Sequence, residues 1–150
     1  MHSYNGLDQE QRSIFLDIAH FFRRFEQNQA TRILDGFYGR PVIFDISTLI
    51  DKCLITTSRN MLEIHDLLQE MAFSIVRAES KFPGKRSRLC HLTDIVHVLE
   101  ENKVKVEVFR YLSFLCSDIL TKRFHICSKV DVFEYVVLLF VYSLFLFNRN

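Results

Sequence analysis

The chain has 150 residues, of which 49% are hydrophobic and 25% are charged, with four glycines and two prolines. This composition fits one helix-rich globular domain and excludes a disordered tail or a fibrous repeat. The formal net charge is +1, so no overall field attracts nucleic acid or an anionic membrane. The four cysteines form no CxxC pair, and no apolar signal segment precedes them. We therefore expect reduced thiols in a cytoplasmic or nuclear protein, without disulfides or zinc.

Three helices are predicted in the first third of the chain from apolar residues at helical spacing. Asp8 and Gln11 have the spacing of a capping box for the first helix. The second should end at Asp35-Gly36, where glycine can adopt a left-handed conformation. The predicted ranges are about Gln9–Phe25, Gln29–Leu34 and Ile43–Lys52. The residues of the third helix that are expected to face inward are Ile46, Leu49, Ile50 and Cys53.

A change from helical to alternating periodicity predicts a short β-hairpin after these helices. The runs Leu54–Ser58 and Met61–His65 are rich in β-prone residues, and Leu62 and Ile64 alternate with polar neighbours. Residues 59–60, Arg-Asn, can form the tight turn between the two strands. Three helices followed by a hairpin is the element order of a winged helix.

A further helix is predicted over Leu67 to about Glu79. Asp66 is placed to be its N-cap, and Gln69 repeats the capping-box spacing. A basic loop, Lys81–Arg88, follows, and we interpret it as a solvated loop or an intramolecular contact. Thr93 can cap one more helix after this loop.

The composition changes near residue 103, where phenylalanine, valine and leucine become dominant. We therefore predict a mainly α fold, with a winged-helix domain over residues 3–102 and a hydrophobic helical tail over residues 103–150. Residues 132–147 are mostly apolar, but a spanning helix needs roughly 20 such residues. The tail is interpreted as poorly folded sequence from a gene-model artefact or truncated paralogue; a membrane anchor through residues 132–147 is the alternative.

Six motifs of this chain occur in an order typical of one protein family. They are SYNGLD at residues 3–8, IFLDIAHFF at 14–22, TRILDG at 31–36, LIDKCLI at 49–55, IHDLLQEM at 64–71 and PGKRSRL at 83–89. Together they resemble the winged-helix part of the NB-ARC module in plant disease-resistance receptors of the TIR-NBS-LRR type. The resemblance covers about residues 3–102, and it implies a regulatory domain that closes over bound ADP in the resting state of defence signalling.

The resemblance also assigns a cofactor-binding role to Ile64, His65 and Asp66, which match the Met-His-Asp motif of this family. It implies that His65 reaches the β-phosphate of ADP and that Asp66 orients the junction and keeps the module closed. The local chemistry agrees, because the N-terminus of a helix favours an anion. Without the resemblance, we would interpret Asp66 as an N-cap and His65 as a solvent-facing turn residue.

The sequence contains no GxxxxGK[ST] phosphate loop. We therefore expect no ADP or ATP binding by the chain alone, and nucleotide only within a full NB-ARC module. The expected partner is the nucleotide-binding domain of an intact receptor. Alternatives are an interaction or decoy protein that docks onto such receptors, and a membrane-anchored adaptor.

Enzymatic and DNA-binding functions are both disfavoured by the sequence. Cys53, His65 and Asp66 could be imagined as a catalytic set, but His65 and Asp66 are adjacent and point differently along the chain. The third helix is expected to expose Asp45 and Asp51, which would repel DNA phosphates. We therefore expect a non-enzymatic protein that binds no metal or nucleic acid.

Overall fold

The computed structural model describes residues 2–89, 93–94 and 97–98. The chain divides into two units, Met1–Cys90 and His91–Asn150, and the named elements lie in the first. In this part, η1 is a π-helical turn and η2 is a 3₁₀ turn. The elements in chain order are α1 (His2–Asn5), α2 (Gln9–Asp17), η1 (Ile18–Phe22), α3 (Gln27–Tyr38), α4 (Ile43–Asp51), β1 (Thr56–Ser58), β2 (Met61–Glu63), α5 (Asp66–Glu79) and η2 (Pro83–Lys85).

Several predictions fall on residues that the structure does not describe. The boundary between residues 102 and 103 and the apolar run 132–147 lie outside the described residues, and both stay predictions. The helix predicted to start at Thr93 is covered only by residues 93–94 and 97–98, which are helical. Within the described ranges, no helix is long and apolar enough to cross a membrane.

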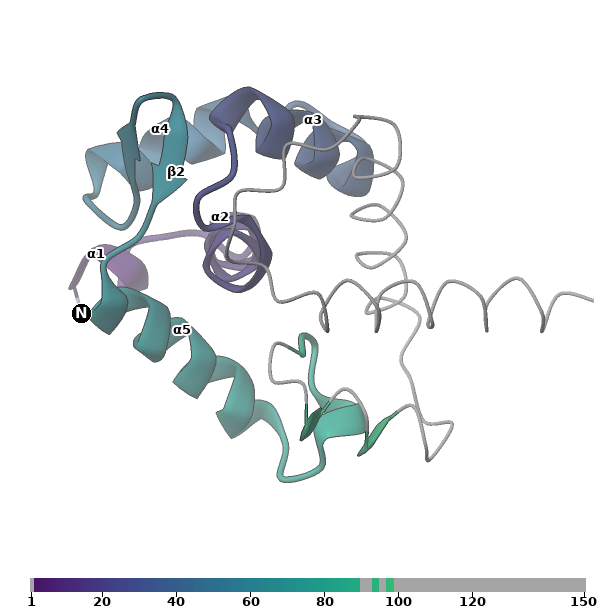
Figure 1. The fold of residues 1–150 in the computed structure, drawn as a ribbon. Coiled ribbons are helices and arrows are strands. Elements are labelled where there is room, and N and C mark those ends of the chain that lie inside the picture. Colours follow the sequence, from purple (N-terminus) through teal and green to yellow (C-terminus); the bar gives the residue numbers. More distant parts are fainter. Residues whose placement is uncertain (1, 90–92, 95–96, 99–150) are drawn as a thin grey trace, which may run out of the picture. The chain divides into compact units, whose positions relative to one another are not determined.

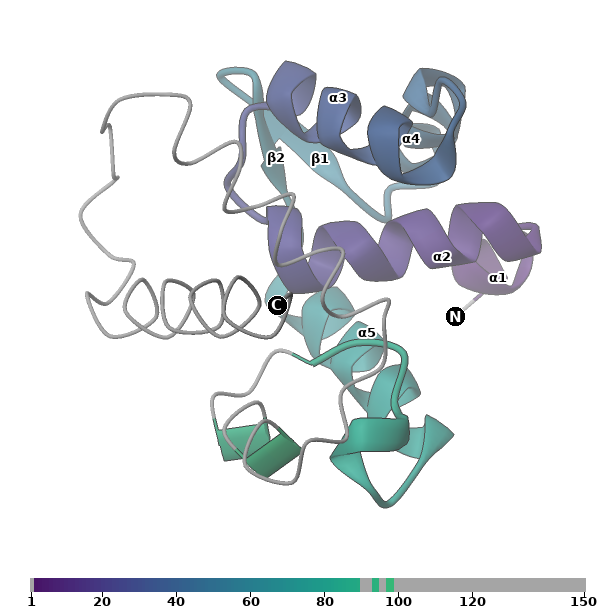
Figure 2. The same ribbon diagram turned by 90° about the vertical axis from the view of Figure 1, so that its right-hand side faces the viewer.

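Helix α2 lies at the centre of the first unit, between the α3–α4 pair and α5 (Figures 1 and 2). Its predicted capping box is confirmed: the Asp8 carboxylate accepts from the Gln11 N–H at 2.8 Å, and the Gln11 side chain accepts from the Asp8 N–H at 3.3 Å. Burying large apolar side chains is the main favourable contribution to folding. The buried apolar stripe of α2 and η1 comprises Ile14, Phe15, Ile18, Ala19 and Phe22.

The first helical segment ends at Phe22, and the prediction that it continues to Phe25 is wrong. Arg23 is extended, with φ −60° and ψ 129°, and Arg24 has a φ of 66°. A positive φ is unfavourable for a residue with a side chain, so surrounding contacts must hold Arg24 in place. The backbone of Arg24 pairs with the hairpin, as the next section describes.

Helix α3 is longer than the sequence predicted, and its predicted end at Asp35-Gly36 is wrong. Gly36 lies inside the helix, and the left-handed residue that ends it is Gly39, with φ 67°. The extra turn places the Tyr38 hydroxyl 2.6 Å from a carboxylate oxygen of Asp17. Contacts made by this last turn offset the weak helix propensity of glycine.

Helix α4 matches its predicted range to within one residue. Ile46 and Leu49 are buried as expected, and Ile50 is partly buried. The prediction for Cys53 is wrong, because this residue is exposed. Cys53 follows the end of the helix and has a φ of 56°, so it no longer follows the helical repeat that placed it on the inner face.

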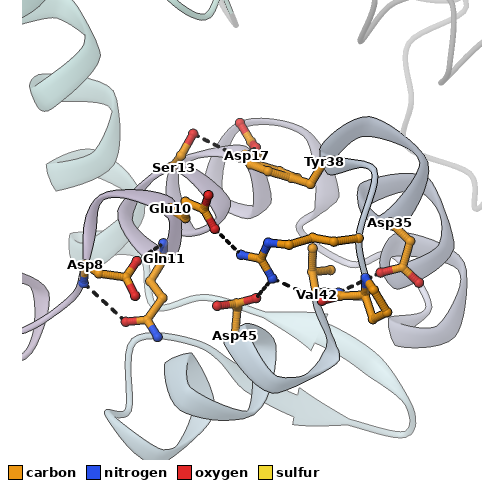
Figure 3. A network of polar contacts seen from close by, with 11 residues as sticks. Asp8, Glu10, Gln11, Ser13, Asp17, Asp35, Tyr38, Val42 and Asp45 are labelled. Carbon is orange, nitrogen blue, oxygen red and sulfur yellow. Dashed lines mark hydrogen bonds and ion pairs between the residues drawn. The ribbon is translucent and has the colours of Figure 1, made fainter.

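A polar network joins α2 to the loop between α3 and α4 (Figure 3). The guanidinium of Arg40 donates to Glu10 at 2.5 Å and to Asp45 at 2.7 Å. The Asp35 carboxylate accepts from the Val42 N–H at 2.7 Å. Asp45 is therefore buried, at 8% exposure, and the expectation that it faces solvent on α4 is wrong.

The predicted hairpin is present, with β1 and β2 antiparallel and Ser58 opposite Met61. Both turn residues, Arg59 and Asn60, have a positive φ, as a two-residue type I′ turn requires. Leu62 is buried, and the predicted alternation of inward and outward residues on the second strand is confirmed.

A buried ion pair between Arg88 and Asp17 connects the segment after α5 to α2. Asp17 is 0% exposed and Arg88 is 8% exposed, and the Arg88 Nε donates to Asp17 at 2.5 Å. Another guanidinium nitrogen donates to the carbonyl and the hydroxyl of Ser13, at 3.0 and 2.8 Å. Burial of the Tyr38 hydroxyl beside this pair raises its pKa above the usual range, and the charge of Asp17 raises this pKa further. At Arg88 the basic loop is therefore an intramolecular contact, one of its two predicted interpretations.

We predict that Arg88→Met lowers the free energy of unfolding by about 3–5 kcal/mol, because it leaves the Asp17 carboxylate buried without this partner. Arg77→Met is the matched control, since the Arg77–Glu70 pair is exposed and spans 3.6 Å. It should cost less than about 1 kcal/mol. Urea denaturation followed by circular dichroism measures both. Equal losses in the two variants would contradict a special role for the buried pair.

Candidate functional site

Ile64, His65 and Asp66 lie at the junction where β2 leads into α5. The second strand ends at Glu63, and α5 begins at Asp66. Ile64 is buried, whereas His65 and Asp66 are exposed. The three residues therefore consist of one apolar anchor and two polar side chains at the surface. Their role in nucleotide binding stays a prediction.

The N-cap of α5 is His65, and the prediction that Asp66 is the cap is wrong. His65 has the extended backbone of a capping residue, with φ −65° and ψ 139°. Its Nδ1 atom accepts a hydrogen bond from the Leu67 N–H at 3.2 Å. Because Nδ1 is the acceptor, a neutral His65 ring carries its hydrogen on Nε2. The ring can therefore donate from Nε2 to an anion while Nδ1 caps the helix.

Asp66 is the first residue of α5, and its carboxylate contacts Arg23. The Arg23 guanidinium donates to an Asp66 carboxylate oxygen at 2.6 Å. Another nitrogen of the same guanidinium donates to the Gln69 side-chain oxygen. The Gln69 side-chain amide donates in turn to the Ala19 carbonyl at 2.9 Å. The prediction that Gln69 completes a capping box with Asp66 is therefore wrong, because its side chain joins α5 to η1.

The backbone after η1 places Arg23 beside this junction. The Arg24 N–H donates to the Leu62 carbonyl at 2.7 Å, and the Leu62 N–H donates to the Phe25 carbonyl at 2.8 Å. Glu26, two residues after Arg24, forms an antiparallel β-bridge with Met61. Strand β2 is thus paired along both edges, with β1 on one side and residues 24–26 on the other. Arg23 directly precedes this pairing.

The arrangement offers hydrogen-bond donors, and it lacks the parts of a metal site. At the start of α5, backbone N–H groups and the helix dipole favour negative charge. Leu67, next to His65, is 74% exposed, so an apolar side chain lies beside the polar pair. In the described part of the chain, no group of three or more His, Cys, Asp or Glu residues could hold a metal ion. This surface therefore offers hydrogen-bond donors that can contact an anion, with an exposed apolar side chain beside them.

Comparison with known protein families gives a match to the winged-helix domain of Roq1-like disease resistance proteins over residues 8–80. Residues 8–80 of the chain therefore form a winged-helix domain of this family. The observed elements agree, because the described part is mainly helical and carries one two-stranded antiparallel sheet.

Curated relatives of this winged helix are plant disease resistance proteins. RPV1 of Vitis rotundifolia is 38% identical over 145 residues, which cover 94% of this chain, and RUN1 of the same species is 41% identical over 131 residues, which cover 87%. RRS1 of Arabidopsis thaliana is 36% identical over 103 residues, which cover 69% of this chain. The chain spans 10% of the length of the first two relatives and 7% of the third. The match to RPV1 extends past residue 102.

The sequence placed His65 and Asp66 in this winged helix, but it gave no indication of Arg23. Arg23 lies 43 positions before Asp66, and it is one of two consecutive arginines after an apolar stripe. The helix predicted from this pattern continued to Phe25, so Arg23 was placed inside a helix and not beside the hairpin. Knowing that residues 24–26 pair with β2 would have revealed the contact.

We predict that His65→Ala lowers the free energy of unfolding of this winged helix by about 1 kcal/mol, the usual value of a side-chain N-cap. His65→Asn should leave stability nearly unchanged, because asparagine can also accept from the backbone at the N-cap position. Urea denaturation compares the two variants with the parent. A loss of the same size in both variants would show that capping is not the structural role of His65.

Proposed function

We propose that this winged helix is the regulatory domain of a plant immune receptor and helps to hold the ADP-bound resting state in defence signalling. The observation that supports this most strongly is the geometry of His65, whose Nδ1 caps α5. With Nδ1 occupied by the cap, Nε2 is the atom of the ring that can donate to a ligand beside the junction. A phosphate there would also be favoured by the helix dipole.

The proposed role requires a second protein domain. One imidazole donor and one helix terminus supply only a small part of the contacts that a nucleotide needs. The sequence contains no phosphate loop, so the remaining contacts must come from a nucleotide-binding domain of the receptor. The exposed Leu67 side chain beside His65 suits a surface that such a domain covers. In this proposal the winged helix is a non-enzymatic part of the switch and acts in the cytoplasm.

The isolated chain should neither bind ADP tightly nor hydrolyse ATP, because it supplies only one part of the proposed nucleotide site. Isothermal titration calorimetry of the purified chain with ADP and magnesium should show no binding in the micromolar range. A phosphate-release assay with ATP should match the buffer control. Micromolar ADP binding by the chain alone would contradict the need for a second domain.

In a full-length receptor that carries this winged helix, His65→Asn should raise basal cell-death signalling. The substitution keeps the N-cap but removes the imidazole donor, so it separates the proposed contact with ADP from the folding role of His65. We expect ADP to dissociate on the order of tenfold faster, a typical coupling between a ligand and a switch. Transient expression in leaves measures signalling, and release of a fluorescent ADP measures dissociation. Unchanged signalling and ADP release would exclude the proposed role of His65.

A further inference from the structure

We propose that Arg23 is a positioning residue for the His65–Asp66 junction, and that it neutralises the Asp66 carboxylate where a phosphate must approach. The proposal rests on the proposed function above, since it concerns the same site. It assigns a role to a residue of the segment between η1 and α3, remote in sequence from the junction.

The Arg23 contacts form a bridge between two elements. Its guanidinium divides its donors between Asp66 and Gln69, and Gln69 donates onward to the Ala19 carbonyl in η1. The planar guanidinium fork fixes the direction of both acceptors, which a single lysine charge cannot do. The first turn of α5 is thereby held against the end of η1, and His65 lies directly before this turn.

The charges at the junction show why such a partner is needed. Asp66 occupies the first position of α5, where the helix dipole favours one negative group. A phosphate bound to His65 would lie beside the carboxylate, and two like charges in close proximity repel each other. The Arg23 guanidinium, 2.6 Å from an Asp66 oxygen, supplies the opposite charge. The carboxylate can then remain at the helix terminus without repelling a bound nucleotide.

The exposure of the pair indicates that its main effect is on the ligand rather than on folding. The Asp66 side chain is 79% exposed and the Arg23 side chain is 27% exposed. Water screens the exposed Asp66 carboxylate, so its ion pair with the partly buried Arg23 contributes less to the stability of the fold than a fully buried pair does. A bound nucleotide and a covering domain would exclude this water and strengthen the interaction. The stability and the nucleotide affinity of Arg23 variants should therefore change independently.

The test uses charge reversal in the full-length receptor that carries this winged helix. Arg23→Glu should accelerate the release of fluorescent ADP, on the order of tenfold, and raise basal signalling, because it leaves two carboxylates where the phosphate approaches. The double variant Arg23→Glu/Asp66→Arg restores an opposite-charge pair and should return both readouts toward the parent. Arg23→Lys keeps the charge without the fork, so it should give an intermediate rate.

Arg24→Glu is the matched control, because it makes the same change in net charge at the adjacent exposed residue. It should leave ADP release unchanged, and thermal unfolding should confirm that all variants fold. The proposal is overturned if Arg24→Glu and Arg23→Glu accelerate ADP release equally, or if the double variant releases ADP as fast as Arg23→Glu. If His65→Asn accelerates ADP release but Arg23→Glu does not, the assignment of Arg23 fails while the proposed function stands. If neither does, both fail.

Discussion

The backbone of Leu62 joins the hairpin to the segment that follows η1, and the position of the His65–Asp66 pair depends on this join. Leu62 donates to Phe25 and accepts from Arg24, while its side chain is fully buried. In an antiparallel pair, alternate residues direct both backbone groups away from the partner strand. The backbone N–H and C=O groups of Leu62 therefore pair with Phe25 and Arg24 on the outer edge of the hairpin. The strand that leads to His65 is therefore fixed on two sides, which gives the polar pair a defined place on a rigid base.

Features determined by residues close together in the chain could be predicted from the sequence. The Asp8–Gln11 capping box involves residues three positions apart, and the Arg59-Asn60 turn involves two adjacent residues. Alternation along the second strand correctly gave the buried Leu62. The place of Ile64, His65 and Asp66 between a hairpin and a helix start could be predicted from local periodicity as well. Their choice as the candidate site came from the family resemblance.

Features that depend on tertiary contacts were missed. Gly36 looked like a helix end, but contacts of the following turn, such as that of Tyr38 with Asp17, extend α3 past it. Asp66 has a stronger intrinsic preference for the N-cap than His65. Arg23 instead attracts the Asp66 carboxylate, and the cap lies one residue earlier. Neither outcome could be derived from spacing, because both depend on groups that only the folded chain brings together.

The buried pair between Asp17 and Arg88 has a consequence for where the domain can be cut. The two residues are 71 positions apart, and Arg88 lies beyond residues 8–80, the stretch that matches the family model. A fragment that ends at residue 80 would keep the Asp17 carboxylate and lose the Arg88 guanidinium that pairs with it in the interior. The smallest fragment that folds in the same way should therefore extend at least to Arg88.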